Sequence, residues 1–218
     1  MKIILFSDLH PQECFDPDSK VITGKMCEFI KQSYPIGETI YIFALGDIGN
    51  KGESTSYNIA SEIFNFIREQ LNNWKVIFEF IPGNHDMNEE TGFESFDSFI
   101  SQYQNTPHRF CMFPTYSIIY SDINFIFTNS VNHRGSRKQG SVDIDTICNS
   151  IKAGMRNVLL MHHSLLNHGN GSYQDHSSIS ESAELSRVLN AANVEFVFCG
   201  HTHKNVTLPT IGHINHIG

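Results

Sequence analysis

Five apolar segments of this chain are each followed, within three residues, by an aspartate, a histidine or an asparagine. The segments have the length of β-strands and are rich in β-branched and aromatic side chains. They cover residues 2–6, 39–45, 76–81, 158–161 and 194–199. Open α/β sheets bind ligands beyond the carboxyl ends of their strands, so this pattern predicts a sheet with one polar site at that edge.

Helical patterns separate several of these strands. We predict helices at 18–33, 53–72 and 179–192, where apolar residues recur with the spacing of one buried face. Segments 116–120 and 123–127 flank a two-residue turn and predict an antiparallel hairpin. The alternation predicts an α/β fold in which helices join central parallel strands and the hairpin extends the sheet.

The polar residues after the strands form short motifs. Asp8 and His10 follow the first strand with one residue between them, and we expect extended backbone to point both side chains to one side. His201 and His203 repeat this spacing after the last strand, where Gly200 permits a tight turn. The other strands lead into Gly46-Asp47, Gly83-Asn84-His85-Asp86 and His162-His163.

Each motif taken alone has an ordinary structural explanation. Asp-x-His pairs occur in exposed loops, Gly-Asp and Gly-Asn pairs are common turns, and adjacent histidines occur at core edges. Their occurrence in order, each directly after a strand, favours one shared site. Carboxylate and imidazole groups together suit Mn, Fe or Zn better than Ca or Mg, which prefer oxygen ligands.

Composition narrows the class of protein. Hydrophobic residues make up 40% and charged residues 17% of the 218 residues, as in a packed domain. The five cysteines are scattered, which argues against a disulfide framework and predicts reduced thiols. No segment has the length of a membrane span or the form of a targeting signal, so we expect a cytoplasmic protein without membrane contact. The net charge of -8 disfavours sequence-independent binding to nucleic acid.

The motif series as a whole resembles the calcineurin-like metallophosphoesterase superfamily, from residue 8 to residue 203. The resemblance implies a four-layer αββα sandwich with mixed sheets and a dinuclear metal site at the strand ends. It also implies two divalent ions, either Mn, Fe or Zn with Mn favoured, bridged by Asp47. One ion would be held by Asp8, His10 and His203, and the other by Asn84, His162 and His201.

A mechanism follows from the same resemblance. A hydroxide bridging the two ions would attack phosphorus, so no side-chain nucleophile is required. His85 would contact the phosphate and protonate the leaving group, while Asp86 would orient and charge-stabilise that histidine. We therefore expect hydrolysis of a phosphodiester or phosphomonoester, with a small phosphoester or a nucleotide as substrate. His163 receives no assigned role.

Two alternatives stay open from the sequence. A nuclease acting on DNA or RNA would use the same chemistry, although the acidic balance favours a small substrate. A non-catalytic scaffold of the same fold is disfavoured, because no ligand position of the pattern is lost. The stretches 132–141 and 165–178 are interpreted first as surface loops. As the alternative, Arg134, Arg137 and Lys138 of the first would bind an extended anionic substrate, and the second would be a substrate-gating loop on the rim of the metal site.

Residues 1–218 are interpreted as a single metallophosphoesterase domain. Residues 214–218 resemble the return strand of the superfamily, cut before its turn is complete. This predicts that the chain is the N-terminal catalytic part of a longer protein, with a C-terminal domain or a protein partner.

Overall fold

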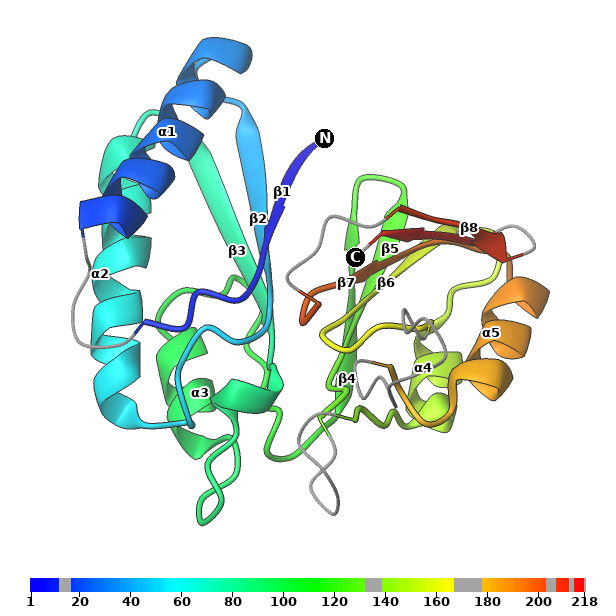
Figure 1. The fold of residues 1–218 in the computed structure, drawn as a ribbon. Helices are drawn as coiled ribbons and strands as arrows, with labels where there is room; N and C mark the ends of the chain where they lie inside the picture. Colours follow the sequence, from blue (N-terminus) through cyan, green and yellow to red (C-terminus); the bar gives the residue numbers. More distant parts are fainter. Residues whose placement is uncertain (12–16, 132–138, 167–177, 203–206, 212–213, 218) are drawn as a thin grey trace.

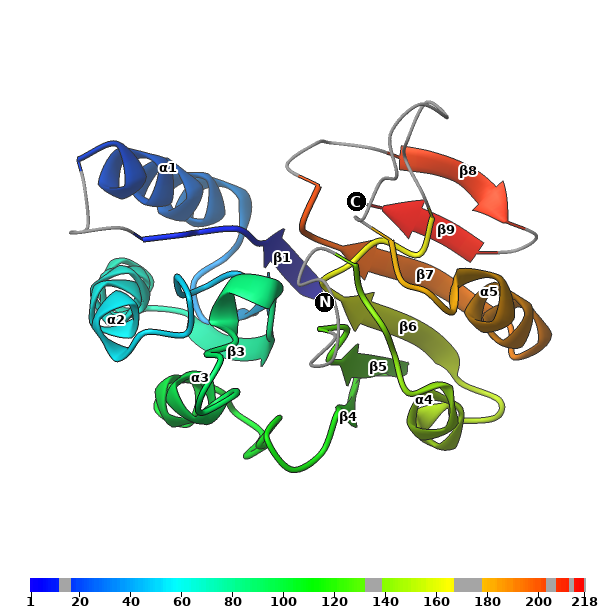
Figure 2. The same ribbon diagram turned by 60° about the horizontal axis from the view of Figure 1, so that its bottom comes forward.

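Two β-sheets face each other at the centre of the molecule, and helices cover their outer faces (Figure 1; Figure 2). The computed structural model describes residues 1–11, 17–131, 139–166, 178–202, 207–211 and 214–217, with side chains up to residue 202. The order of helices, sheet, sheet and helices confirms the α/β class and the four-layer αββα sandwich.

The first sheet contains three parallel strands in the order β1-β2-β3. These are β1 (Lys2–Phe6), β2 (Thr39–Leu45) and β3 (Lys75–Ile81). Its covering helices are α1 (Pro17–Ser33), α2 (Ser54–Gln70) and α3 (Glu94–Ile100). Parallel pairing in register, with Phe6 opposite Ala44 and Leu45 opposite Ile81, brings all three carboxyl ends to one edge.

The second sheet has the order β4-β5-β6-β7-β9-β8. Strands β5, β6, β7 and β9 are parallel, and β4 and β8 are antiparallel edge strands. Their bounds are β4 (Thr115–Tyr120), β5 (Ile123–Thr128), β6 (Arg156–Met161), β7 (Val194–Cys199), β8 (Thr207–Ile211) and β9 (Ile214–Ile217). Helices α4 (Ile144–Ser150) and α5 (Ser182–Ala191) cover its outer face.

Phenylalanine side chains join the two sheets. The ring of Phe43 on β2 lies 5.2 Å from the rings of both Phe125 and Phe127 on β5. Ile126, between them, points to the opposite face and packs in the separate cluster that includes Leu185 and Leu189 of α5. Burial of a side chain of this size stabilises a fold by about 1.5–3 kcal/mol, so this interface holds the strand ends in a fixed relation.

The predicted strands and hairpin lie where the sequence places them, and α1, α2 and α5 correspond to the three predicted helices. The return strand is β9. The sequence pattern does not predict α3, α4 or β8. Helices α3 and α4 have seven residues each, which is too few for hydrophobic periodicity to distinguish them from loops.

A buried carboxyl group lies between the two sheets. Glu79 of β3 is 0% exposed and accepts hydrogen bonds from the hydroxyls of Tyr116 (3.0 Å), Tyr120 (2.5 Å) and Thr106 (3.2 Å). Burial raises the pKa of Glu79 above its usual value, although these hydroxyls oppose the shift by stabilising the charged form. The folded protein therefore favours the protonated carboxyl more than the unfolded chain does.

We expect Glu79→Gln to stabilise the protein more at about pH 7 than at about pH 4. Because the folded-state pKa is raised, the stability contributed by protonated Glu79 is fully present below the unfolded-state pKa. It is lost as pH rises through the folded-state pKa. Each unit of raised pKa corresponds to about 1.4 kcal/mol, or several degrees in Tm. Thermal unfolding at both pH values checks this, with exposed Glu62→Gln on α2 as control. An equal gain at both would contradict it.

Candidate metal centre

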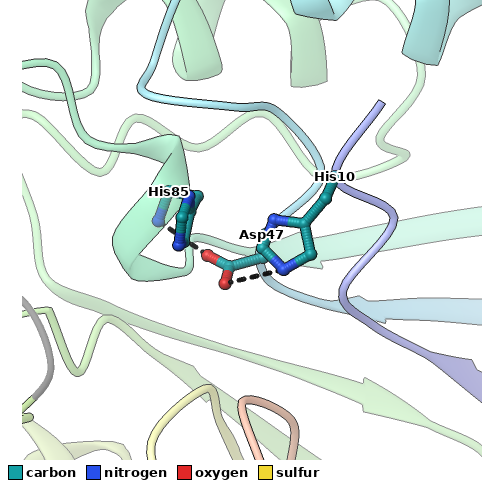
Figure 3. Close-up of side chains that lie close together, drawn as sticks. All are labelled: His10, Asp47 and His85. Atoms are coloured by element: carbon teal, nitrogen blue, oxygen red, sulfur yellow. Dashed lines mark hydrogen bonds and ion pairs between the residues drawn. The ribbon is translucent and has the colours of Figure 1, made fainter. Parts of the chain in front are cut away.

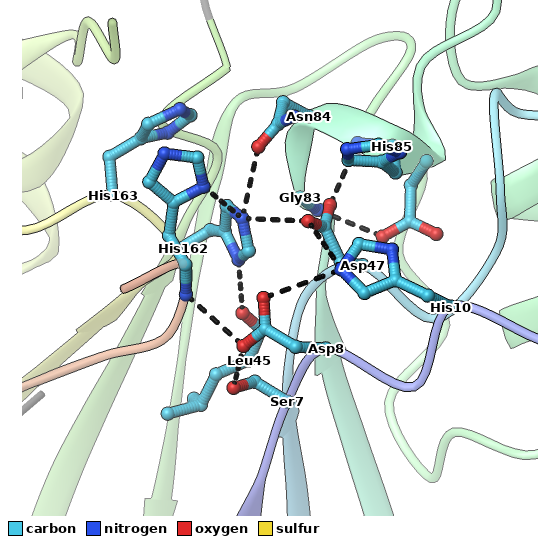
Figure 4. A network of polar contacts seen from close by, with 12 residues as sticks. Ser7, Asp8, His10, Leu45, Asp47, Gly83, Asn84, His85, His162 and His163 are labelled. Carbon is cyan, nitrogen blue, oxygen red and sulfur yellow. Dashed lines mark hydrogen bonds and ion pairs between the residues drawn. The ribbon is translucent and has the colours of Figure 1, made fainter. Parts of the chain in front are cut away.

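The sequence predicts seven metal ligands and two catalytic residues, His85 and Asp86. Leaving Asp86 aside, all of them except His203 lie in the described part of the chain, and these seven converge at one edge of the two sheets (Figure 4, where all but His201 are labelled). They follow β1, β2 and β3 in the first sheet and β6 and β7 in the second. The converging residues are Asp8, His10, Asp47, Asn84, His85, His162 and His201. His203 lies outside the described residues.

Asp47 lies at the centre of the group. Its Oδ2 atom is 3.5 Å from Nε2 of His10 and 3.3 Å from Nε2 of His162, and its Oδ1 accepts the backbone N–H of His85 at 2.7 Å (Figure 3). Burial acts to raise the pKa of Asp47, but the charge and hydrogen bond of His162 outweigh it and hold the pKa well below its usual range. The carboxylate is therefore ionised, and two imidazole nitrogens face one of its oxygens.

His162 shows that this arrangement suits a cation. Its Nδ1 lies 2.7 Å from the carbonyl oxygen of Leu45, which only accepts, so Nδ1 carries a proton. In the neutral ring Nε2 is then a lone pair, and it faces Oδ1 of Asn84 at 3.2 Å as well as the Asp47 carboxylate. Nε2 can therefore share either a proton or a metal ion with these oxygens.

The pKa of His162 shows that its surroundings favour a positive charge at this point, which in the absence of a metal ion is a proton on the ring. The ring is 0% exposed. Burial opposes its charged form, yet the Asp47 carboxylate raises the pKa of His162 to about 9. The donor set of carboxylate, amide and imidazole groups accordingly fits divalent Mn, Fe or Zn.

His10 and Asp8 form the more exposed side of the centre. Nε2 of His10 lies 3.7 Å from Oδ1 of Asp8. Oδ2 of Asp8 accepts the backbone N–H of His201 at 3.2 Å and the hydroxyl of Ser7. The Asp8 carboxylate raises the pKa of His10, although burial opposes the shift. A carboxylate after β1 is thus tied to the loop after β7 in the other sheet.

The expected backbone geometry of the Asp8-x-His10 motif is wrong. Strand β1 ends at Phe6, and Asp8 and His10 have φ values of 60° and 40°, in the left-handed region. Extended alternation therefore does not bring these side chains together; a compact left-handed turn does. His201 has φ 70°, so its motif does not start from extended backbone either.

Asp47 shares this strained conformation, with φ 53°. Non-glycine residues at positive φ cost free energy, on the order of 1–3 kcal/mol each, and persist only where the surroundings fix them. Gly83 makes the position of Asp47 feasible, because a Cβ atom there would collide with the Asp47 carboxylate. Gly46 similarly leaves room for His162, whose Nδ1 would lie 2.6 Å from an added Cβ.

His85 lies in the short helical turn η1 (Asn84–Asp86) at the end of β3. Its ring contacts the ring of His10 edge-to-face, with centroids 4.6 Å apart. Its Nδ1 lies 3.4 Å from Oδ1 of Asn50. Asn50 is not among the site residues that the sequence predicts, although it lies five residues after the end of β2, in the loop that contains Asp47.

Asp86 is 0% exposed and connects the loops after β2 and β3. Its carboxylate accepts the backbone N–H groups of Gly49 (2.6 Å), Gly83 (2.9 Å) and Ile48 (3.2 Å), and the Tyr57 hydroxyl (3.0 Å). Burial and the nearby Asp47 charge raise the pKa of Asp86 to about 6, although the backbone N–H groups oppose this. Through these contacts Asp86 positions the backbone of the loops after β2 and β3. Direct orientation of the His85 ring by Asp86 stays a prediction.

Among the described residues, two overlapping groups of donor atoms meet the distance requirement of a metal site, with all atoms of a group within 4.8 Å of one another. One contains His10, Asp47 and His85, and the other contains Asp47, His162 and His201. Asp47 belongs to both. This is the arrangement that a residue shared by two ions requires.

The chain belongs to the calcineurin-like phosphoesterase family, whose sequence profile matches residues 1–205. None of the curated proteins compared with the chain matches it. Among solved structures, it is similar to the purple acid phosphatase PPD1 from yellow lupin (Lupinus luteus) seeds, with a TM-score of 0.66 and 15% identity. The match covers 99% of this chain and 43% of the lupin protein, so the chain spans less than half of that relative's length.

Two further solved structures share the fold. Phosphopantetheinyl hydrolase from Mycobacterium tuberculosis has a TM-score of 0.59 at 13% identity, covering 99% of this chain and 87% of its own. GAP50, described as the anchor in the inner membrane complex of Plasmodium, has a TM-score of 0.63 at 16% identity, and the match covers 99% of this chain and 70% of GAP50. In the part of this chain that the structure describes, no helix is long and apolar enough to cross a membrane.

Proposed function

We propose that this protein is a metal-dependent phosphoesterase that binds two divalent ions. The observation that carries the proposal is Asp47, a buried carboxylate that belongs to both donor groups of the centre. In the proposal, one ion has the ligands Asp8, His10, Asp47 and His203. The other has the ligands Asp47, Asn84, His162 and His201.

Ions held by these residues would neutralise phosphate oxygens, lower the pKa of a water molecule and favour its attack on phosphorus. The protein's own residues then have separate tasks. Asp47 and Asp8 supply negative charge that holds the ions, and His162 is fixed in its orientation by the Leu45 carbonyl. His85 protonates the leaving group; its backbone is held by Asp47, and its ring lies against Asn50 and His10.

The donor set bears on the identity of the ions, and the net charge bears on the identity of the substrate. A mixed oxygen and nitrogen donor set accepts Mn, Fe and Zn, and Mn stays the favoured ion of the proposal. The net charge of -8 favours a small phosphoester or a nucleotide over a nucleic acid. Arg134, Arg137 and Lys138, together with residues 167–177, lie outside the described residues and do not enter the proposal. Cytoplasmic location stays a prediction; the four described cysteines form no disulfide.

Hydrolysis of bis-p-nitrophenyl phosphate and p-nitrophenyl phosphate, after removal of metal by a chelator and again after addition of Mn, tests this function. We expect release of p-nitrophenolate only with Mn, and the ratio of diester to monoester rates narrows the substrate class. Faster cleavage of a labelled oligonucleotide would favour a nuclease. Failure of the protein to bind metal would favour the scaffold alternative, since GAP50, which shares the fold, is described as an anchor.

A further inference from the structure

A histidine without an assigned role lies directly behind the candidate ligands. His163 follows the ligand His162 and is 0% exposed. Its backbone N–H donates to Oγ of Ser130 at 2.9 Å, and its Nδ1 lies 3.0 Å from the same oxygen. Ser130 is also 0% exposed, and its carbonyl accepts the backbone N–H of Ser141 at 3.0 Å. One serine thus fixes both the backbone and the ring of His163.

Gly140 closes the other side of the ring. A Cβ atom at position 140 would lie 2.5 Å from Cγ of His163, so backbone and ring are in direct contact. Gly140 is itself held by hydrogen bonds with Ser178 (3.2 Å) and Ser180 (2.9 Å). The ring of His163 is therefore confined by packing as well as by its hydrogen bond.

The confined ring lies against His201. The two ring centroids are 4.6 Å apart, and the His201 ring in turn presents Nδ1 to Nε2 of His162 at 3.1 Å. His201 needs such support, because its backbone is in the left-handed region and its side chain is partly exposed. Its backbone N–H is held by Asp8, but that contact does not set the direction of the ring.

We propose that Ser130 and His163 form a positioning pair that sets the ring orientation of His201 and thereby the affinity of the metal centre. The inference rests on the proposed function, since it takes His201 as a ligand. Ligand-supporting residues of this kind change metal affinity by ~10–100-fold when they are replaced. The pair does not contact the substrate or the reacting atoms in this scheme.

Two variants separate the contributions of the pair. Ser130→Ala removes the hydroxyl and keeps the ring, while His163→Asn keeps a polar group near the Nδ1 position and removes the ring. Ser164→Ala is the matched control, because Ser164 is also 0% exposed and its hydroxyl donates to the Leu166 carbonyl at 2.7 Å. The Ser164→Ala variant loses a buried hydroxyl next to His163 in sequence but keeps both contacts between Ser130 and His163.

Titration of the metal-free proteins with Mn gives the affinity, and the visible spectrum of the Co-loaded proteins reports ligand geometry. We expect Ser130→Ala and His163→Asn to weaken Mn binding at least ~10-fold and to change the Co spectrum. Ser164→Ala should stay within about twofold of wild type, with similar thermal stability of all metal-free variants. Wild-type affinity in both pair variants, or an equal loss in the control, would overturn the inference alone. Failure of the wild-type protein to bind Mn would overturn the proposed function with it.

Discussion

Asp47→Asn is expected to abolish hydrolysis and to reduce the metal content of the purified protein. The substitution puts a neutral amide where two imidazole nitrogens, those of His10 and His162, now face a carboxylate oxygen. Bound metal ions supply several kcal/mol of transition-state stabilisation, and each 1.36 kcal/mol corresponds to a factor of ten. We therefore expect turnover of bis-p-nitrophenyl phosphate to fall by about three orders of magnitude or more.

The measurement combines initial rates with elemental analysis of metal per chain. Asp97→Asn is the matched control, because Asp97 is another buried aspartate, on α3, that accepts backbone N–H groups of Phe110 (2.8 Å) and Cys111 (2.9 Å). It should lower thermal stability and leave metal content unchanged. Retention of two ions and of wild-type turnover by Asp47→Asn would remove the basis of the dinuclear assignment.

The convergence of most of these residues could be predicted from the sequence because its signal lies in strand order. Each apolar segment ends in a polar motif, and parallel strands bring their carboxyl ends to one edge. Within the first sheet this reasoning places Asp8, Asp47 and Asn84 together. His162 joins them because the second sheet packs with its strand ends at the same edge, which strand order alone does not predict. The order β7-β9-β8 at the edge of the second sheet is, in contrast, set by pairing between distant segments, and no local pattern encodes it.

The local geometry of the site could not be predicted in the same way. Strand propensity favours extended backbone through Asp8 and His10, yet both adopt the left-handed region that ordinary residues avoid. Only tertiary contacts, such as the hydrogen bond from the His10 backbone to the Asp47 carbonyl (3.2 Å), hold such a turn. Asn50 and Ser130 were missed for a related reason. Their importance comes from what they contact, His85 and His163, and not from their sequence neighbours.

His85→Ala is expected to reduce turnover of a phosphoester with a basic leaving group by about 10²–10⁴ while leaving the metal content at its wild-type value. In the proposed mechanism His85 donates a proton to the departing oxygen and is not a ligand. The structure makes this a demanding test. A ring nitrogen of His85 lies close enough to a ring nitrogen of His10 and a carboxylate oxygen of Asp47 to form a donor group with them. A loss of metal equal to that of Asp47→Asn would identify His85 as a ligand.

Leaving groups of different basicity separate proton donation from other roles of His85. p-Nitrophenolate departs without a proton, whereas phenolate or an alkoxide requires one, so the rate loss should grow as the leaving group becomes more basic. His108→Ala is the control, since its ring stacks on Tyr116, at 4.4 Å between centroids, outside the metal centre. A rate loss that is equal for all leaving groups, with both ions retained, would mean that His85 binds phosphate without protonating the product. Asn50→Asp distinguishes the two roles, because it places a carboxylate beside Nδ1 of His85. If His85 is the general acid, this charge should shift the pH profile of turnover; if His85 only binds phosphate, the variant should have little effect.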